Sequence, residues 1–436
     1  MIFNMINPRC RLIYAFLFVQ FILFSNLYQP SFQSVEPKLT NQIFKVEKVV
    51  RGLDYPVGIA FLDKDDFLII EKNSGQVKRF TNGTLLDQTI LDLNVANENE
   101  RGLVGIAISK NNSENKTYVF LYLTESRSMD GEDECIDFHC DPQHNYIGNR
   151  LYRYEFKDNA LINPKLLLDI PPTLSPMHVG GKIVIGKDNN LYVGVGDLNN
   201  DDQITTNTIN GSFPNGSAGI IRLTQNGSKV TPGIFGDEYP YYLYYAYGIR
   251  NVFGLGFDPL TGNLWDTENG PGYGDEINLV FPGFNGGWKV VSGNREATSY
   301  TGGNPTLNPV NLTTLNGIGE YSLPELTWDR FTVGPTSLVF LNSTQYGNDY
   351  KNDMFVSVIK PNGNLYHFDL ANNNNRTELA LDKTIGLENK TVLHPDDLEP
   401  YLFGKSFGGI ADLEVSPDGY LYVVSFFQDT IFKIVK

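Results

Sequence analysis

The sequence predicts an all-β protein, and more specifically a six-bladed β-propeller. Two observations lead to this fold class: a strand-turn-strand pattern recurs six times, and no stretch of useful length outside the N-terminal segment has the periodicity of a helix. One such unit buries little surface by itself, so the copies must pack face to face. Radial repetition of small antiparallel sheets is the usual way to achieve this packing.

The clearest copy is the segment 177–197, MHVGGKIVIGKDNNLYVGVGD. It predicts a half-buried strand over 182–186, a turn rich in Asp and Asn, and a second β-branched and aromatic strand over 191–195. His178 and a Gly-Gly pair stand just before the first strand. There the side chain can point at a ligand and the backbone can approach that ligand closely.

The other five copies are spread over the rest of the chain with uneven spacing, which predicts long loops after some of the blades. They lie at 57–80, 104–124, 255–280, 337–370 and 410–435.

The N-terminal segment, residues 1–36, predicts an export signal or an uncut signal anchor. Arg9 and Arg11 precede an apolar run over 12–27, and a polar segment follows. We therefore expect an extracellular or cell-surface protein whose propeller domain spans 43–436. Membrane contact is expected only through this segment.

Composition and charge narrow the function classes. The chain has 436 residues, 41% of them hydrophobic and 19% charged, which allows a large core and excludes a multispanning membrane protein. The formal net charge of -16 makes nucleic acid an unsuitable partner. Dispersed acidic residues suit a solvated surface and, where they cluster, calcium.

Cysteine usage fits an oxidising compartment. Cys10 lies in the export segment, which leaves Cys135 and Cys140 for one short-range disulfide. The neighbouring His139 and His144 leave a metal site as the alternative, although this loop lacks an established zinc spacing. Several Asn-x-Ser/Thr sequons indicate solvated loops that can be glycosylated outside the cell.

Three groups of residues resemble the quinoprotein glucose/sorbosone dehydrogenases, including the PQQ-dependent aldose sugar dehydrogenases. They are His178 with Gly181, the run YGIRNVFGLGFDPLTGNLW, and the run ENGPGYGDEINLVFPGFNGGW. The segments ERGLVGIA and NRLYRYEF add to the resemblance, which covers nearly all of the chain after Ile43. Each motif is weak singly, because Gly pairs and Asp-x-Gly turns occur in any all-β protein, but together they are specific.

The resemblance implies a pyrroloquinoline quinone (PQQ) across the top of the propeller and a calcium ion that bridges it to the protein. The backbone carbonyls of Gly270 and Pro271 match the family's calcium ligands, and oxygen is the ligand that calcium prefers. Asp275 and Glu276 are candidates for a structural calcium. Either residue would equally serve to cap or brace a turn.

The resemblance also implies roles for five side chains. His178 matches the base that takes the proton from a sugar hydroxyl. Arg250 matches the group that stabilises charge on the reduced quinone, while Asn251, Lys360 and Thr332 match cofactor-binding residues. The alternatives are a hydrogen-bonded loop histidine and an arginine that joins blades through an ion pair with a nearby aspartate.

Departures from the family's pattern limit what can be transferred. Glu100 stands where glucose dehydrogenases carry a sugar-contacting glutamine, which indicates a different substrate. Gly409 and Ala411 stand where two arginines bind the cofactor's carboxylates, so two contacts of about 1.5–3 kcal/mol each are absent. Lys405 is a candidate to compensate for them. Met177 replaces an acidic residue beside the histidine.

The resulting hypothesis is an exported PQQ-dependent sugar dehydrogenase that acts on a small-molecule sugar and an external electron acceptor. Two other classes stay open. One is a calcium-dependent propeller hydrolase of the lactonase type, which would need side-chain carboxylates that converge on the axis. The other is a non-enzymatic extracellular binding propeller that has lost the cofactor.

Overall fold

The computed structural model describes residues 36–436 with the exception of 112, 128–145, 297–311, 361 and 372–374. Contacts divide the chain into two units, 1–35 and 36–436, and the account that follows concerns the second unit. The predicted export segment, apart from Glu36, lies outside the described residues. So do Cys135 and Cys140, and with them the predicted disulfide.

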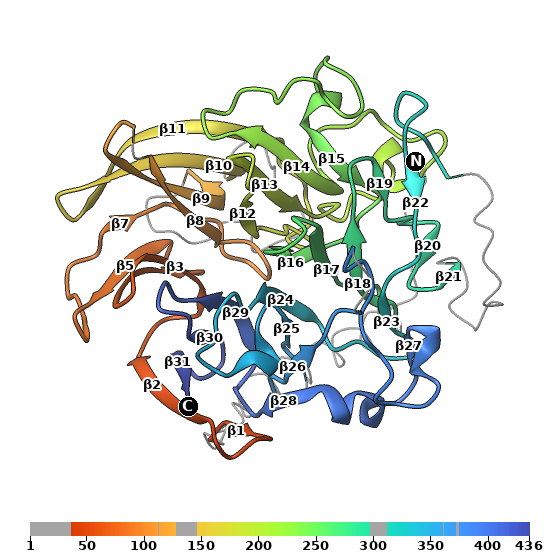
Figure 1. The fold of residues 1–436 in the computed structure, drawn as a ribbon. Coiled ribbons are helices and arrows are strands. Elements are labelled where there is room, and N and C mark those ends of the chain that lie inside the picture. The colour runs from red at the N-terminus through yellow and green to blue at the C-terminus, as the bar shows by residue number, and fades with distance from the viewer. Residues whose placement is uncertain (1–35, 112, 128–145, 297–311, 361, 372–374) are drawn as a thin grey trace, which may run out of the picture. The chain divides into compact units, whose positions relative to one another are not determined.

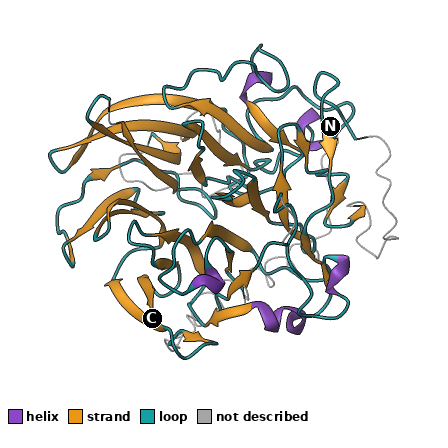
Figure 2. Ribbon diagram, in the orientation of Figure 1, coloured by secondary structure: helices purple, strands orange, loops and turns teal. Residues whose placement is uncertain are grey.

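The described chain is all-β and propeller-like, as the sequence predicted (Figure 1). Short antiparallel sheets are arranged around a centre, and long loops connect them (Figure 2). Helical structure in the described residues is limited to short 3-10 segments: η1 (Ile204–Thr206), η2 (Tyr241–Leu243), η3 (Asn348–Tyr350), η4 (Leu387–Asn389) and η5 (Pro395–Tyr401). None of these helices is long and apolar enough to cross a membrane.

Six sheets of four to six strands occur in the described residues, numbered here by the chain order of their innermost strands. Sheet one contains β3 (Pro56–Asp63), β4 (Asp66–Glu71), β5 (Gln76–Thr81), β6 (Thr84–Leu85) and β7 (Leu91–Asp92). Sheet two contains β8 (Leu103–Asn111), β9 (Lys116–Ser126), β10 (Tyr146–Lys157) and β11 (Ala160–Ile170). Sheet three contains β12 (Ile183–Ile185), β13 (Asn190–Val195), β14 (Gly219–Thr224), β15 (Tyr244–Tyr247), β19 (Phe284–Asn285) and β22 (Glu320–Tyr321).

The remaining sheets come mostly from the second half of the chain. Sheet four contains β16 (Val252–Phe257), β17 (Leu264–Glu268), β18 (Asp275–Val280), β23 (Leu326–Trp328) and β27 (Thr391–Val392). Sheet five contains β24 (Pro335–Phe340), β25 (Met354–Val358), β26 (Leu365–Phe368), β28 (Leu402–Lys405) and β1 (Lys38–Leu39). Sheet six contains β29 (Ile410–Val415), β30 (Leu421–Ser425), β31 (Thr430–Val435) and β2 (Lys45–Arg51), and a small hairpin pairs β20 (Val291–Ser292) with β21 (Arg295–Glu296).

The innermost strands form a closed ring. Strands β3, β8, β12, β16, β24 and β29 contact one another in this order, and β29 returns to contact β3. Each of the six predicted strand-turn-strand copies supplies one of these strands. The clearest copy forms β12 and β13 with Ile183 opposite Val193, within one residue of the predicted strands.

The N-terminal strands close the structure by pairing with the C-terminal part of the chain. Strand β2 pairs antiparallel with β31 at the outer edge of sheet six, and β1 pairs with β28 in sheet five. Because these pairs join residues almost 400 positions apart, they hold both ends of the chain on the ring.

The hydrophobic core is divided among the interfaces between neighbouring sheets. Each of the six large clusters of buried apolar side chains in the described residues draws on two adjacent sheets. Trp265 and Trp328, for example, are fully buried between sheets four and five. The aromatic segment 241–247 forms η2 and β15, and its tyrosines pack in such interfaces.

Candidate functional site

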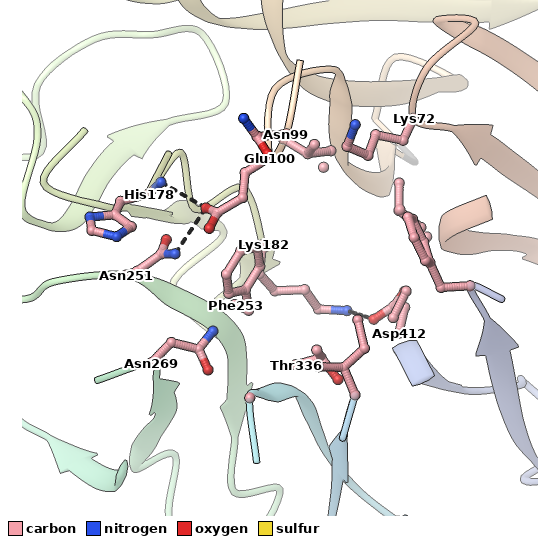
Figure 3. A pocket seen from close by; sticks show the side chains of 18 of the residues that line it. Lys72, Asn99, Glu100, His178, Lys182, Asn251, Phe253, Asn269, Thr336 and Asp412 are labelled. Atoms are coloured by element: carbon pink, nitrogen blue, oxygen red, sulfur yellow. Dashed lines mark hydrogen bonds and ion pairs between the residues drawn. The ribbon is translucent and has the colours of Figure 1, made fainter. Parts of the chain in front are cut away.

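A cavity with a volume of about 360 Å³ lies at one end of the ring of innermost strands. Every sheet contributes to it, because many lining residues lie in or just before the first half of an innermost strand, and others follow the second strand of a sheet. Representative lining residues are Val57 and Ile106 from β3 and β8, Lys182 before β12, Phe253 and Thr336 from β16 and β24, and Ala411 from β29. Figure 3 shows that polar side chains gather around this cavity from several sheets.

His178 lines the cavity and is held in a fixed conformation. Its φ of 59° places it in the left-handed region, which costs energy for a residue with a Cβ atom. Two backbone contacts hold it there: its N–H donates to a carboxylate oxygen of Glu100 at 2.7 Å, and its carbonyl accepts from the N–H of Leu198 at 3.2 Å. The side chain is 6% exposed, so little freedom is left to the ring.

Asp197 fixes the orientation of the His178 ring. One carboxylate oxygen lies 2.6 Å from His178 Nδ1, and the other accepts the indole N–H of Trp288 at 2.8 Å. The sequence reasoning did not single out Asp197. A signal for it existed, because β12 and β13 are antiparallel, and residues just before β12 and just after β13 must therefore meet at the same end of the hairpin.

Glu100 joins three of the predicted residues into one network. The oxygen that accepts the His178 N–H also accepts the side-chain amide of Asn251 at 3.0 Å, and the amide oxygen of Asn251 accepts the N–H of Gly180 at 3.2 Å. Figure 3 shows Glu100 between His178 and Asn251. The structure therefore brings together residues that lie 151 positions apart in the sequence.

Arg250 contacts backbone oxygens in place of a carboxylate side chain. Its guanidinium donates to the carbonyls of Asn269 at 2.8 Å and Gly270 at 3.1 Å, and it lies 5.4 Å from the centre of the Trp288 ring. The alternative of an ion pair with Asp258 or Asp275 is wrong. Asp258 pairs with Arg376 at 2.9 Å, and Asp275 accepts backbone N–H groups.

The other predicted binding residues also line the cavity. Thr332 lies between β23 and β24, and Lys360 follows β25 and is exposed to solvent. Met177, 37% exposed, lies beside the histidine. The expectation that Lys405 compensates for the missing arginines is wrong. Lys405 lies in β28 opposite Lys38, at an outer strand pair of sheet five, and it does not line the cavity.

The Gly180-Gly181 pair serves packing between strands, which corrects the expectation that its backbone faces a ligand. A Cβ atom at Gly181 would come within 2.8 Å of Val104, and one at Gly180 within 2.5 Å of the Gly194 carbonyl. Neither glycine lines the cavity. Their small size lets sheets two and three approach each other beneath His178.

The predicted calcium ligands fall into two groups. Gly270 uses its carbonyl as an acceptor for Arg250, and its N–H donates to Asp275 at 2.9 Å. Asp275 also accepts the N–H groups of Val333 at 2.7 Å and Gly334 at 2.8 Å, so this carboxylate braces a turn. Burial raises the pKa of Asp275, and the three N–H donors oppose that rise. Pro271 lies in the same loop outside the cavity lining.

Glu276 belongs to a buried acidic cluster inside sheet four. Asp266 and Glu268 on β17 lie opposite or beside Glu276 and Asn278 on β18, and all four are at most 5% exposed. Desolvation raises the pKa of Asp266 to about 7 and of Glu276 to about 8, and raises that of Glu268 well above its usual value. Both oxygens of Asp266 and one each of Glu268 and Asn278 have no hydrogen-bond partner among the described residues.

The positions of the missing arginines differ from each other. Gly409 adopts φ 76°, and a Cβ atom there would lie 2.6 Å from the ring of Phe427, so a side chain does not fit without rearrangement. Ala411 lines the cavity and leaves space in front of it. The sequence predicted the loss of both arginines but not this difference between the two positions.

Two buried lysines in the cavity have different partners. Lys182 contacts Asp412 at 2.6 Å and Glu414 at 2.9 Å, and the attraction of these carboxylates outweighs burial, so the pKa of Lys182 is raised. Lys72 donates only to neutral oxygens, Asn73 Oδ1 at 2.6 Å and the Asn97 carbonyl at 3.0 Å. Burial lowers the pKa of Lys72 to about 8, although the charge of Glu100 opposes that effect.

A second group of metal-binding side chains lies away from the cavity, at the ends of β25 and β26. Asp353, His367 and Asp369 place one ligand atom each within 4.8 Å of one another. His367 Nε2 lies 3.0 Å from Asp353 and 3.4 Å from Asp369, distances that also suit a hydrogen-bonded ion pair. Sequence reasoning missed this group, because nothing in the spacing of the three residues distinguishes them.

The fold and the site together define a class of protein: a propeller-like all-β protein with a ligand cavity on the axis and an oriented histidine inside it. The family model for "Glucose / Sorbosone dehydrogenase" matches residues 53–431, and the chain belongs to this family. Membership confirms the resemblance on which the site residues were assigned.

Three relatives show how far the similarity extends. An uncharacterized protein of Synechocystis is 25% identical over 90% of this chain and 86% of its own length. Quinoprotein glucose dehydrogenase B of Acinetobacter calcoaceticus is 27% identical over 60% of this chain and 56% of its own length. The PQQ-bound aldose sugar dehydrogenase of Streptomyces coelicolor shares the fold, with a TM-score of 0.61 at 20% identity over 92% of this chain and 99% of that one.

Proposed function

We propose that this protein is a PQQ-dependent dehydrogenase that oxidises a hydroxyl group of an aldose. The observation that carries the proposal is the pair formed by His178 Nδ1 and Asp197 at 2.6 Å, in a cavity that Arg250 and Asn251 also line. Family membership supports the same reaction class, because quinoprotein glucose dehydrogenase B is among the relatives.

His178 acts as the base. The Asp197 carboxylate accepts a hydrogen bond from Nδ1–H, so Nε2 keeps its lone pair and can take a proton from a sugar hydroxyl. When bound, PQQ supplies a carbonyl that accepts the hydride from the same substrate carbon. An external acceptor would take up the two electrons, and both protons would return to solvent, the hydroxyl proton from His178 and the other from the hydride.

The cavity fits a flat cofactor with polar edges. Ile106, Phe253 and Phe426 provide apolar walls, Asn251 provides a fixed amide, and Thr332 and Lys360 stand at the rim. Because Gly409 and Ala411 replace two arginines, we expect a lower affinity for PQQ than a site with both arginines would have. Arg250 lines the same cavity and would stabilise negative charge that develops on a bound cofactor.

Two places support calcium binding. The Gly270 and Pro271 carbonyls supply neutral oxygen ligands next to the cavity. The second place is the buried acidic cluster of sheet four, which a divalent cation would stabilise. Its unpaired oxygens belong to Asp266, Glu268 and Asn278. We assign a structural calcium to this second set, with Glu276 among its ligands.

Glu100 is the candidate for sugar contact. Its second carboxylate oxygen, Oε1, has no hydrogen-bond partner among the described residues, whereas Oε2 holds His178 and Asn251. A carboxylate accepts hydrogen bonds from hydroxyl groups but cannot donate them, as the glutamine at this position in glucose dehydrogenases can. We therefore expect a sugar preference that differs from that of glucose dehydrogenases.

We also infer that the propeller has six blades, that segment 1–36 directs export, and that the mature protein acts outside the cell. Six sheets of at least four strands and a closed ring of six innermost strands support the blade number in the described chain. Arg9, Arg11 and the apolar run that follows support export.

The two alternative functions differ in what supports them. A lactonase-type hydrolase gains no support, because the cavity carboxylates Glu100, Asp275 and Asp412 each already bind protein donors. A non-enzymatic binding protein is favoured by one observation, the loss of both arginines at Gly409 and Ala411.

The deciding experiment is to titrate the purified protein with PQQ and calcium and to measure dye reduction with a panel of aldoses. We expect saturable PQQ binding and sugar-dependent turnover. H178A should lose turnover while its affinity for PQQ stays within about 3-fold, since the base acts on substrate and not on the cofactor's carboxylates. PQQ binding without turnover on any aldose favours the binding protein, and no binding at micromolar PQQ overturns the proposal.

A further inference from the structure

Lys72 is a buried cation in the cavity without a carboxylate partner. It follows β4, lines the cavity and is 7% exposed. Within the described part of the chain, its ammonium group forms no ion pair, and its two hydrogen bonds go to the Asn73 side chain and the Asn97 carbonyl. An ammonium group has three donors, so one N–H is left to point into the cavity.

Lys182 shows what a fully neutralised lysine looks like in the same cavity. Its ammonium lies within 2.9 Å of both Asp412 and Glu414, and Asp412 in turn accepts the hydroxyl of Ser337 at 3.0 Å. Burying a charge without such partners costs free energy, so proteins seldom keep one except for a purpose. Lys72 therefore calls for an anion that the protein itself does not supply.

The surroundings of Lys72 limit where that anion can come from. Glu100 is the acidic group whose field reaches Lys72, but the two form no ion pair in the described residues, and the Oε2 atom of Glu100 holds His178 and Asn251. Figure 3 shows Lys72 on the side of the cavity away from His178, with Asn99 and Glu100 between them. An anion bound to Lys72 would thus lie across the cavity from His178. That anion must come from a ligand that enters the cavity.

We propose that Lys72 binds a carboxylate of the ligand that occupies the cavity. The inference rests on the proposed function, because it takes the ligands to be PQQ and a sugar. Two ligands can bring a carboxylate to this place: the cofactor, whose acid groups have lost two arginines at Gly409 and Ala411, or a sugar acid as substrate. In both cases Lys72 determines specificity, because a neutral ligand cannot form the charge-assisted hydrogen bond that a carboxylate forms with Lys72.

The test compares K72M and K72R with wild type by calorimetric titration. For the cofactor arm, the probes are PQQ and its trimethyl ester, which keeps the ring but has no free acid. For the substrate arm, the probes are D-glucuronate and D-glucose added to PQQ-loaded protein. The matched control is K78M on β5, which removes a lysine that pairs with Glu71 at 2.8 Å outside the cavity lining.

If the carboxylate belongs to the cofactor, K72M weakens PQQ roughly 10-fold or more and changes the ester less than about 3-fold. If it belongs to the substrate, K72M leaves PQQ unchanged and weakens D-glucuronate by a similar factor, while D-glucose is unaffected. K72R keeps the positive charge and should stay within about 5-fold of wild type in the affected arm. K78M should match wild type throughout.

Unchanged affinity of K72M for PQQ and for D-glucuronate overturns the inference while leaving the proposed function intact. If wild type binds no PQQ, the proposed function has failed, and D-glucuronate binding to the protein alone decides about Lys72. If K72M does not fold, the same test uses wild type at several pH values. The affinity for PQQ should fall above pH about 8, because Lys72 loses its charge there. The affinity for the trimethyl ester should not fall. A ratio of the two affinities that is constant with pH then contradicts the inference.

Discussion

The Nδ1 atom of His178 lies 2.6 Å from a carboxylate oxygen of Asp197, and both side chains are almost completely buried. The second oxygen of Asp197 is held by the indole N–H of Trp288 at 2.8 Å. Arg250 rests on the same indole ring, at 5.4 Å. The orientation of the base and the placement of the cation are thus coupled through one tryptophan side chain.

Asp197→Asn tests whether Asp197 orients the base. An asparagine can offer its amide N–H to Nδ1, which places the proton of the neutral ring on Nε2 and leaves no lone pair there to accept the substrate's proton. We expect turnover to fall roughly 10²- to 10⁴-fold while PQQ affinity changes little. Stopped-flow dye reduction and PQQ titration measure the two effects separately. Equal losses in both would mean that Asp197 supports the structure of the cavity instead of the base.

Arginine substitutions at Gly409 and Ala411 should have different effects on PQQ affinity and on stability. Ala411 lines the cavity, so A411R can add a charge-assisted contact and should tighten PQQ binding roughly 10- to 100-fold. Gly409 has φ 76° and a Phe427 ring 2.6 Å from the place of a Cβ atom, so G409R should lower the free energy of unfolding by about 1–3 kcal/mol. Titration calorimetry and urea unfolding provide the readouts, and tighter PQQ binding by G409R at unchanged stability would contradict this reading.

Calcium should stabilise the protein through the acidic cluster of sheet four. At about 100 times its Kd, a ligand adds about 2.7 kcal/mol to the free energy of unfolding, so the melting temperature should rise with calcium concentration. E276Q should abolish that rise. E47Q, at an exposed position on β2, should keep it. A calcium-dependent shift that persists unchanged in E276Q would place the ion elsewhere.

Lys72 should make stability depend on pH in the alkaline range. Its pKa is about 8 in the folded protein and higher in the unfolded chain, so the unfolded state binds more protons between these values. The contribution of Lys72 to the free energy of unfolding therefore becomes more favourable as the pH increases from about 8 toward the pKa that Lys72 has in the unfolded chain. Without ligand, K72M should be more stable than wild type at neutral pH by about 1–3 kcal/mol, and the difference should shrink above pH 8. Denaturant unfolding at several pH values tests this, and a difference constant with pH would exclude titration of Lys72.

The ion pairs of Lys182 hold sheets three and six together at the axis. K182M leaves the buried carboxylate of Asp412 without a cation, which should lower the free energy of unfolding by about 3–5 kcal/mol. The control is K187M on the same hairpin, where the exposed lysine reaches only the Pro259 carbonyl. Urea unfolding should show a small effect for K187M, and an equally small effect for K182M would mean that water replaces the lysine.

The sequence by itself determined the repeating unit and the candidate functional residues of the cavity. Strand β12 and its neighbour β13 follow from the alternation of apolar residues and the Asp/Asn turn between them, because both signals are local. His178, Arg250, Asn251, Thr332, Lys360 and Glu100 all line the cavity that the family motifs indicated. The buried turn-bracing role of Asp275 was one of the two alternatives that the sequence left open.

Only the tertiary structure decided which groups meet. Glu100 meets Asn251, and Lys182 meets Asp412, across different sheets, and no local pattern marks such contacts. Lys405 and the Gly-Gly pair looked suited to a ligand, but the ring geometry directs them elsewhere. The physical reason is that strand periodicity specifies which face of a strand is buried, whereas the neighbour that buries it is set by the closure of the six innermost strands around the axis.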